Sequence, residues 1–170
     1  MSAFELFANH GYVTTTVEKI AIKAKVSKGL IYHYFNSKEE ILKGLFGLLR
    51  EESKGLLILR KELPAKAFLK QLIDFSIRYI TQQTKINRLI IALTLQPDVI
   101  SGLKDDLETM RKEWMEPLFI IFKELNFDNP EAEAYLFGAM MDGLSIGYIT
   151  MGEGYPLKKL KKLIEMRYGV

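Results

Sequence analysis

Residues 4–46 of this 170-residue chain read FELFANHGYVTTTVEKIAIKAKVSKGLIYHYFNSKEEILKGLF, and they are the most informative part of the sequence about the fold. Its apolar residues recur three and four positions apart, which is the period of an amphipathic helix. Thr15, Ser27 and Ser37 are good helix N-caps, and Thr15 and Ser37 are each followed three residues later by a glutamate that completes a capping box. The pattern predicts helices at about residues 3–10, 16–24, 28–35 and 38–54.

The middle of this stretch predicts a helix-turn-helix. Residues 15–35 form a pattern of helix, short turn and helix, and the small side chains of Ala21 and Ala24 would let the two helices approach closely. Apolar residues of both helices can close a small core with Phe4 and Phe7 of the preceding helix. In this motif the second helix enters the major groove of DNA.

The charge along the motif favours contact with nucleic acid. Residues 19–38 contain five lysines and no acidic residue, a local charge of +5 against +3 for the whole chain. Neutralisation of phosphates by basic side chains is the main sequence-independent source of DNA affinity. Tyr32, His33 and Tyr34 fall at the end of the second helix, where their polar atoms could reach phosphates or base edges. A solvated lysine face on a small helical bundle is the alternative interpretation.

A dense series of short motifs runs through the same residues. They are Phe7–Ala8, Gly11–Tyr12, Thr15–Thr16, Ile20–Ala21, Val26–Ser27–Lys28–Gly29, Tyr32-x-Tyr34–Phe35 and Ser37–Lys38–Glu39–Glu40. Together they resemble the DNA-binding domain of the TetR family of bacterial one-component transcriptional regulators. The resemblance implies a helix-turn-helix DNA-binding domain at residues 1–46 and a helical ligand-binding and dimerisation domain at residues 47–170.

The resemblance also implies a role for individual residues. The residues that it places on DNA are Thr15, Thr16, Lys28, Gly29, Leu30, Tyr32, His33, Tyr34 and Lys38. Lys28, Gly29 and Leu30 would face base edges, and Leu30 departs from the small or hydroxylated residue common at that position. The family usually carries a longer first helix, so that Met1 falls in the middle of it. We expect either a native chain that starts earlier or a shortened first helix.

The remaining residues predict more helices, at about 64–83, 86–95, 100–125, 130–151 and 156–169, with a kink near Pro117. Because clean two-residue alternation is missing, the predicted fold class is all-α. Aromatic and methionine side chains at helical spacing are candidates for the wall of an apolar ligand pocket. The candidates are Phe75, Tyr79, Leu93, Met110, Trp114 and Met141. The alternative is that these side chains are simply core.

A ridge of small residues predicts a dimer interface. Ala139, Gly143 and Gly147 recur every fourth residue and would permit close approach of another helix. The residues assigned to the interface are Leu118, Phe122, Leu136, Ala139, Met140, Gly143 and Gly147. Two recognition helices related by a two-fold axis can read a palindrome. An intramolecular contact for the ridge is the alternative.

Other classes of function find little support in the sequence. The chain has no cysteine and only two histidines, and it contains no GxGxxG, P-loop, nucleophile elbow or HExxH motif, so we expect no enzyme, metal site or cofactor. Neither a signal peptide nor a membrane span is visible, which predicts a cytoplasmic protein. The expected partners are a double-stranded DNA operator, a small mostly apolar effector that releases a repressor from it, and a second copy of the chain. A helical small-molecule or protein-binding module that has lost DNA binding is the alternative.

Overall fold

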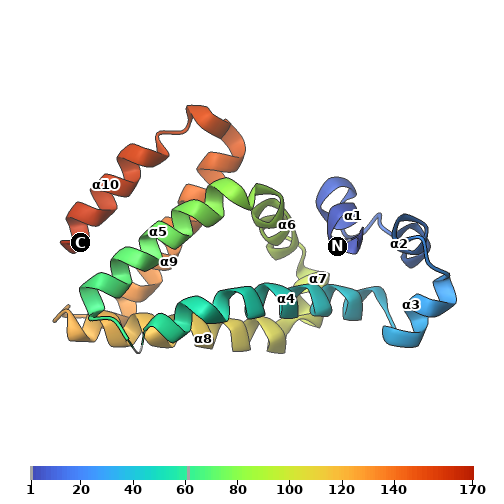
Figure 1. The fold of residues 1–170 in the computed structure, drawn as a ribbon, viewed down its shortest axis with the longest axis horizontal. Coiled ribbons are helices and arrows are strands. Elements are labelled where there is room, and N and C mark those ends of the chain that lie inside the picture. Colours follow the sequence, from blue (N-terminus) through green and yellow to red (C-terminus); the bar gives the residue numbers. More distant parts are fainter. Residues whose placement is uncertain (1, 61) are drawn as a thin grey trace. The chain divides into compact units, whose positions relative to one another are not determined.

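The computed structural model describes residues 2–60 and 62–170, with the side chains of all of these except residues 52–59 and 100. All regular structure in this part of the chain is helical, which confirms the predicted all-α fold class (Figure 1). The helices are α1 (Ser2–His10), α2 (Val17–Ala24), α3 (Lys28–Tyr34), α4 (Lys38–Leu59), α5 (Ala65–Gln82), α6 (Thr84–Thr94), α7 (Pro97–Gly102), α8 (Lys104–Glu124), α9 (Pro130–Met151), the 3-10 turn η1 (Gly152–Gly154) and α10 (Leu157–Tyr168). Among the described helices, none combines the length and the apolar character needed to cross a membrane.

The helices form two compact units. The first consists of Met1–Glu52 and Lys85–Leu107, and the second of Ser53–Thr84 and Glu108–Val170. Helices α4 and α8 each contribute to both units. Residues 85–107, which include most of α6 and all of α7, therefore pack with the N-terminal helices from which they are distant in sequence.

A small apolar core holds the first three helices of the first unit together. Phe7 of α1 is 1% exposed, and Ile20 and Ala21 of α2 and Ile31 of α3 are also buried. The Phe7 ring contacts the ring of Tyr12 edge to face, with 5.1 Å between centroids. Because one face of each short helix is apolar, burying these faces against each other stabilises helices that would be marginal alone.

The second unit is built around an aromatic cluster. The fully buried ring of Phe122 on α8 lies 5.2 Å from Phe127, 5.4 Å from Tyr168 and 6.1 Å from Phe137, measured between centroids. Aromatic pairs at these spacings add about 0.5–1.5 kcal/mol each beyond the apolar area that they bury. The cluster therefore fixes α10 against α8 and α9.

Several boundaries differ from the sequence-based prediction, and α4 continues to Leu59 where an end at about residue 54 was predicted. The N-cap of α2 is Thr16, whose hydroxyl accepts a hydrogen bond from the Lys19 amide at 3.2 Å, and not Thr15. The helix predicted for residues 100–125 is two helices, because α7 ends at Gly102 before α8 begins at Lys104. The 1% exposed side chain of Leu103 anchors the junction between them.

Candidate nucleic-acid interface

The turn between α2 and α3 fixes the direction of α3. Lys25 adopts the left-handed conformation, with φ of 57°, and its amide donates to the Ile22 carbonyl at 3.1 Å. The amide of Val26 donates to the Ala21 carbonyl at 3.1 Å, which completes the C-terminal cap of α2. The predicted cap of α3 is confirmed, since the Ser27 hydroxyl accepts from the Leu30 amide at 3.1 Å.

The outer face of α3 carries large side chains that reach solvent. Leu30 is 45% exposed, Tyr32 47% and Tyr34 70%, whereas Ile31 between them is buried. Lys28, Gly29 and His33 are exposed as well. Two aromatic rings and a leucine exposed on so short a helix are unusual for a surface that meets only water.

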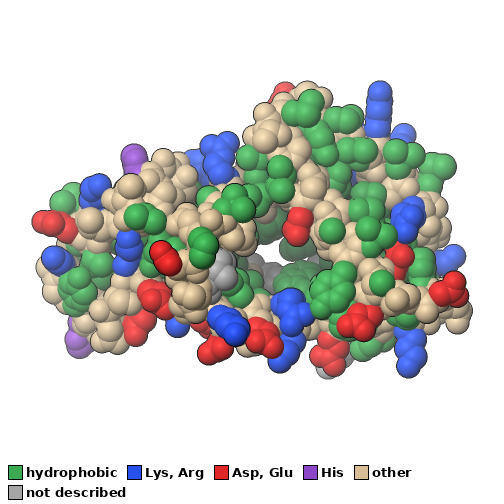
Figure 2. All heavy atoms as spheres, turned by 180° about the vertical axis from the view of Figure 1, so that it is seen from behind, with side chains coloured by type: hydrophobic (Ala, Val, Ile, Leu, Met, Phe, Trp, Pro, Cys, Tyr) green, Lys and Arg blue, Asp and Glu red, His purple; other side chains and the backbone are tan. Residues whose placement is uncertain are grey.

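Polar contacts along this face join basic and aromatic groups. The Lys28 ammonium lies 5.9 Å from the centroid of the Tyr32 ring, and the His33 and Tyr34 rings meet edge to face at 5.0 Å. Figure 2 shows lysine and both histidine side chains at the surface of the N-terminal unit. The face therefore presents cationic donors, hydroxyls and apolar carbon together, which are the groups that bind phosphates and base edges.

The two threonines at the start of α2 have different environments. Thr16 is exposed and caps the helix. Thr15 is only 1% exposed, and its hydroxyl donates to the Gly11 carbonyl at 2.8 Å. The Thr15 hydroxyl therefore stabilises the turn that follows α1, and of the two threonines that the resemblance places on DNA only Thr16 is exposed.

Lys38 binds the loop between α1 and α2. Its ammonium donates to the carbonyls of Tyr12 at 2.8 Å and Val13 at 3.1 Å, and it lies 4.4 Å from the centroid of the Tyr12 ring. Burial lowers the pKa of Lys38, and burial together with the nearby Glu39 carboxylate raises the pKa of Tyr12. The family resemblance places Lys38 on DNA, but no local signal in the sequence indicates that two carbonyls 25 and 26 residues earlier in the chain bind its ammonium.

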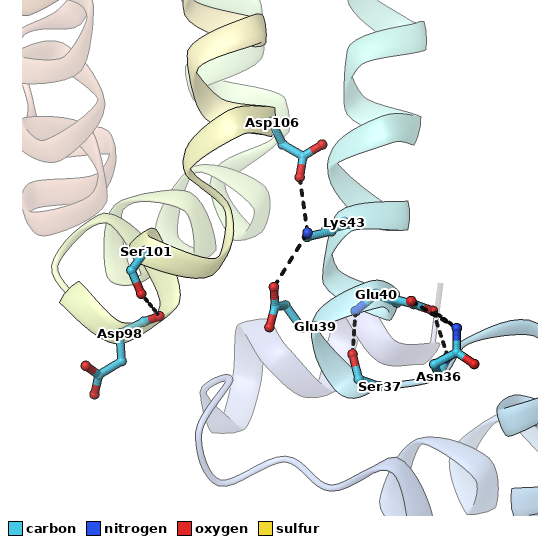
Figure 3. Close-up of polar contacts among 8 residues, drawn as sticks. All are labelled: Asn36, Ser37, Glu39, Glu40, Lys43, Asp98, Ser101 and Asp106. Atoms are coloured by element: carbon cyan, nitrogen blue, oxygen red, sulfur yellow. Dashed lines mark hydrogen bonds and ion pairs between the residues drawn. The ribbon is translucent and has the colours of Figure 1, made fainter.

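A polar frame fixes the start of α4, directly after α3 (Figure 3). The Ser37 hydroxyl accepts from the Glu40 amide at 3.1 Å, as the predicted cap requires. The Glu40 carboxylate accepts from the Asn36 amide at 2.7 Å and from its side-chain nitrogen at 3.0 Å, bonds that lower the pKa of Glu40. The glutamate of the capping box therefore binds one residue earlier than expected.

The same end of α4 is tied to α7 and α8. The Lys43 ammonium lies 3.6 Å from Glu39 and 3.7 Å from Asp106, so it bridges α4 and the beginning of α8 (Figure 3). The Glu39 carboxylate packs against Gly102, where a Cβ atom would lie 2.7 Å from its oxygen. A movement of α7 would therefore displace Glu39 and with it the start of α4, the helix that follows α3.

The residues considered for a ligand pocket fall in different places. Phe75, Trp114 and Met141 are partly buried against the core of the second unit, and the Phe75 and Tyr79 rings stack with 6.0 Å between centroids. Leu93 is 1% exposed and belongs to the first unit, where it lines an apolar cavity that the sequence did not indicate. The remaining candidate, Met110, is half-buried on α8.

The residues considered for a dimer interface also divide into two groups. Leu118 and Phe122 are buried in the core of their own unit, so neither is available to a second chain. On α9, Leu136 is 45% exposed, Ala139 and Gly143 are exposed, and Met140 is half-buried. Tyr155 covers Gly147, because a Cβ atom at Gly147 would lie 2.2 Å from the Tyr155 ring.

Further apolar side chains extend the exposed part of this face. Ile146 on α9 is 48% exposed, and Leu163 and Met166 on α10 are 59% and 76% exposed. A groove of about 420 Å³ runs between α9 and α10, beside Gly143 and Leu163. The sequence does not show that Leu163 and Met166 are exposed, because it does not show which face of α10 packs against the rest of the unit.

The comparisons with known proteins agree with this geometry. Residues 2–45 match the family of bacterial regulatory proteins described as the tetR family. The chain is 56% identical over 41 residues to the HTH-type transcriptional regulator HbdR of Aromatoleum sp. (strain CIB), a match that spans 24% of this chain and 18% of that relative. It is also 44% identical over 61 residues to the fatty acid metabolism regulator protein of Bacillus subtilis (strain 168), spanning 36% of this chain and 29% of the relative.

Among solved structures, the fatty acid degradation regulator FadR from Bacillus halodurans superposes with a TM-score of 0.77 at 21% identity, covering 98% of this chain and 90% of that chain. A TetR-like transcriptional regulator from Rhodococcus sp. RHA1 gives a TM-score of 0.78 at 16% identity, covering 99% and 90%. At these identities the likeness concerns the fold, and it extends over both units. Residues 2–45 therefore match the DNA-binding domain of the tetR family, and the fold of the chain is similar to that of TetR-like regulators over nearly its whole length.

Proposed function

We propose that this protein is a transcriptional repressor that binds a palindromic double-stranded DNA operator as a homodimer. The observation that carries the proposal is the outward face of α3, where Lys28, Tyr32 and Tyr34 are exposed around the buried Ile31. In the helix-turn-helix this is the face that enters the major groove. Residues 1–46 would bind DNA, and residues 47–170 would bind the effector and the second chain.

Within the DNA contact we assign distinct roles to the side chains. Lys28, Gly29 and Leu30 meet base edges, and the aliphatic Leu30 suits the methyl group of a thymine. Tyr32 and His33 contact bases or the backbone, and Tyr34 and Thr16 bind phosphates. We assign Lys38 to holding the loop after α1, since its ammonium already donates to two carbonyls.

A second copy of the chain would set the spacing of the two recognition helices. We place the interface on the exposed residues of α9 and α10, among them Leu136, Gly143 and Leu163, which are apolar or small and lie beside a groove. Burial of this face in a dimer would remove apolar surface that costs free energy in water. Sedimentation velocity should give a dimer for the native chain and a monomer for Ile146→Glu.

Effector release would follow from a population shift. A small apolar molecule that binds better to a conformation with wrongly spaced recognition helices would lower the affinity for the operator. Helix α4 is the proposed link, because it follows α3 directly and continues from the first unit into the second.

The proposal is tested with DNA selected from a random pool by the purified full chain. Fluorescence anisotropy should show that Tyr34→Ala weakens binding to all sequences and leaves the slope of log affinity against log salt unchanged, because a neutral hydroxyl displaces no counterion from DNA. Lys28→Ala should relax the sequence preference, whereas Lys112→Ala, at an exposed lysine of α8, should change neither. If the native chain selects no sequence and binds no duplex, the repressor proposal is wrong and the alternative of a binding module takes its place.

A further inference from the structure

Helix α3 exposes a single aliphatic side chain. Of its two aliphatic residues, Ile31 is buried and Leu30 is 45% exposed. The surface beside Leu30 is open, because residue 29 is a glycine at which an added Cβ atom would meet the Ser27 hydroxyl at 3.9 Å and nothing nearer. Leu30 therefore presents hydrocarbon on the exposed surface of α3 that also carries Lys28 and Tyr32.

Leu30 cannot donate a hydrogen bond to a base. Its side chain contains neither a donor nor an acceptor, and its amide already donates to the Ser27 hydroxyl at 3.1 Å and to the Ser27 carbonyl at 3.1 Å. Base pairs differ in the major groove by the donors and acceptors at N7, O6, N6, O4 and N4. Leu30 has no polar side-chain group with which to distinguish them.

An aliphatic side chain can distinguish the substituent at C5 of a pyrimidine. In the major groove this carbon carries a methyl group in thymine and a hydrogen atom in cytosine. 5-Methylcytosine carries the methyl group at the same carbon, although its pair with guanine keeps the donors and acceptors of an ordinary G·C pair. Contact between Leu30 and this methyl group removes apolar surface of both from water, and cytosine offers no such surface.

We propose that Leu30 recognises the methyl group at C5 of a pyrimidine and not the base pair, so that methylation of an operator cytosine facing Leu30 strengthens binding of this protein. Thymine and 5-methylcytosine are then equivalent at this position, and cytosine and uracil are equally unfavourable. The inference rests on the proposed function, because it requires α3 to lie in the major groove. It goes beyond that function by making operator affinity depend on the product of a cytosine-5 methylation reaction on DNA.

The neighbouring side chains of α3 recognise other features of DNA. The Lys28 ammonium is a donor that suits the O6 and N7 acceptors of guanine, and it lies 5.9 Å from the centroid of the Tyr32 ring. The rings of His33 and Tyr34 contact each other edge to face at 5.0 Å. Lys28 therefore responds to the base pair and Leu30 to the methyl group, so that substitutions of the two residues change specificity in different ways.

The burial of one methyl group sets the size of the effect. A buried methyl or methylene group corresponds to about a fourfold change in affinity. A palindromic operator presents the same base to α3 of both chains, so a change in both half-sites multiplies the two factors and gives about fifteenfold. Replacing thymine by uracil removes the methyl group and keeps every donor and acceptor of the pair, and it therefore isolates this contribution.

The experiment uses the full chain and a duplex that the chain selects from a random pool. Each thymine is replaced by uracil, one symmetric pair at a time, and affinity is measured by fluorescence anisotropy for the native chain and for Leu30→Ala. One symmetric pair should weaken native binding about fifteenfold and change Leu30→Ala binding by less than about twofold. At that pair, cytosine should bind the native chain as weakly as uracil, and 5-methylcytosine should restore most of the affinity.

Matched variants exclude a purely structural effect of the substitution. Leu30→Met keeps an apolar side chain and should keep the dependence on the methyl group. Leu95→Ala removes the same atoms from a leucine that is 78% exposed just after α6, and it should behave like the native chain. If Leu30→Ala does not fold, Leu30→Gln of similar size takes its place and should also lose the dependence, because its amide bonds to polar base edges.

The outcomes separate this inference from the proposed function. If the native chain binds its selected duplex but no thymine methyl group is coupled to residue 30, the recognition of the methyl group is wrong and the repressor proposal stands. The same conclusion follows if 5-methylcytosine binds no better than cytosine. If the native chain selects no sequence and binds no duplex, both proposals fail.

Discussion

Replacing Lys38 by methionine distinguishes two roles of this lysine: holding the loop between α1 and α2 in place, or binding a DNA phosphate. Its ammonium makes two charged hydrogen bonds to the carbonyls of Tyr12 and Val13 and lies over the Tyr12 ring. At a half-buried site each bond contributes about 1 kcal/mol, and the cation–π contact adds about 0.5–1 kcal/mol. Desolvation of the ammonium, which lowers the pKa of Lys38, and loss of side-chain entropy of about 1 kcal/mol offset part of this gain. We therefore expect Lys38→Met to destabilise the first unit by about 1–2 kcal/mol.

The measurement combines urea unfolding followed by circular dichroism with hydrogen exchange of the amides at residues 12–16. Lys38→Met should speed exchange in this loop and weaken operator binding, while the slope of log affinity against log salt stays near that of the native chain. Lys28→Met, at an exposed lysine of α3, should leave the stability within about 0.5 kcal/mol. Unchanged stability and loop exchange in Lys38→Met, together with a salt slope reduced by about one, would refute the positioning role and assign Lys38 to a phosphate.

Three further predictions concern single side chains elsewhere. Lys25→Gly should stabilise the chain by about 0.5–1 kcal/mol in urea titrations, because a left-handed backbone strains every residue that has a Cβ atom. Burial and a 2.8 Å hydrogen bond to Glu133 raise the pKa of Tyr168 from 10.0 to about 12, so its contribution of about 2–3 kcal/mol is complete below pH 10 and is lost as the pH rises toward 12. Tyr168→Phe should therefore be less stable at pH 8 but show a smaller fall in stability between pH 10 and 12, and parallel curves for both proteins would contradict this. Gly147→Ala should cost about 1–3 kcal/mol in thermal unfolding by displacing the Tyr155 ring, and Tyr155→Ala in the same chain should remove most of that cost.

The coupling of α3 to the rest of the first unit depends on contacts that are dispersed in sequence. Lys43 joins Glu39 to Asp106, and Glu39 packs against Gly102. Each such surface ion pair is worth little alone, about 0.2–1 kcal/mol. Together they fix the position of the start of α4 with respect to α7 and the start of α8.

The local structure of this protein could be predicted from its amino-acid sequence. The all-α class, the caps at Ser27 and Ser37 and the helix-turn-helix follow from interactions between residues three or four positions apart, and such interactions are visible in the order of the residues. The exposed face of α3 could be predicted for the same reason, since Ile31 is its only inward-facing residue between Leu30 and Tyr34.

Contacts between residues far apart in the chain could not be predicted and became visible in the folded protein. The tertiary structure gave Thr15 a buried bond, bound Lys38 to a distant loop, buried Phe122 in its own unit and placed Tyr155 on Gly147. It also brought α6 beside α1 and α4, which created the apolar cavity. The physical reason is that packing between helices depends on the paths of the intervening turns and on the shapes of both surfaces, and neither is encoded in the spacing of residues along a single helix.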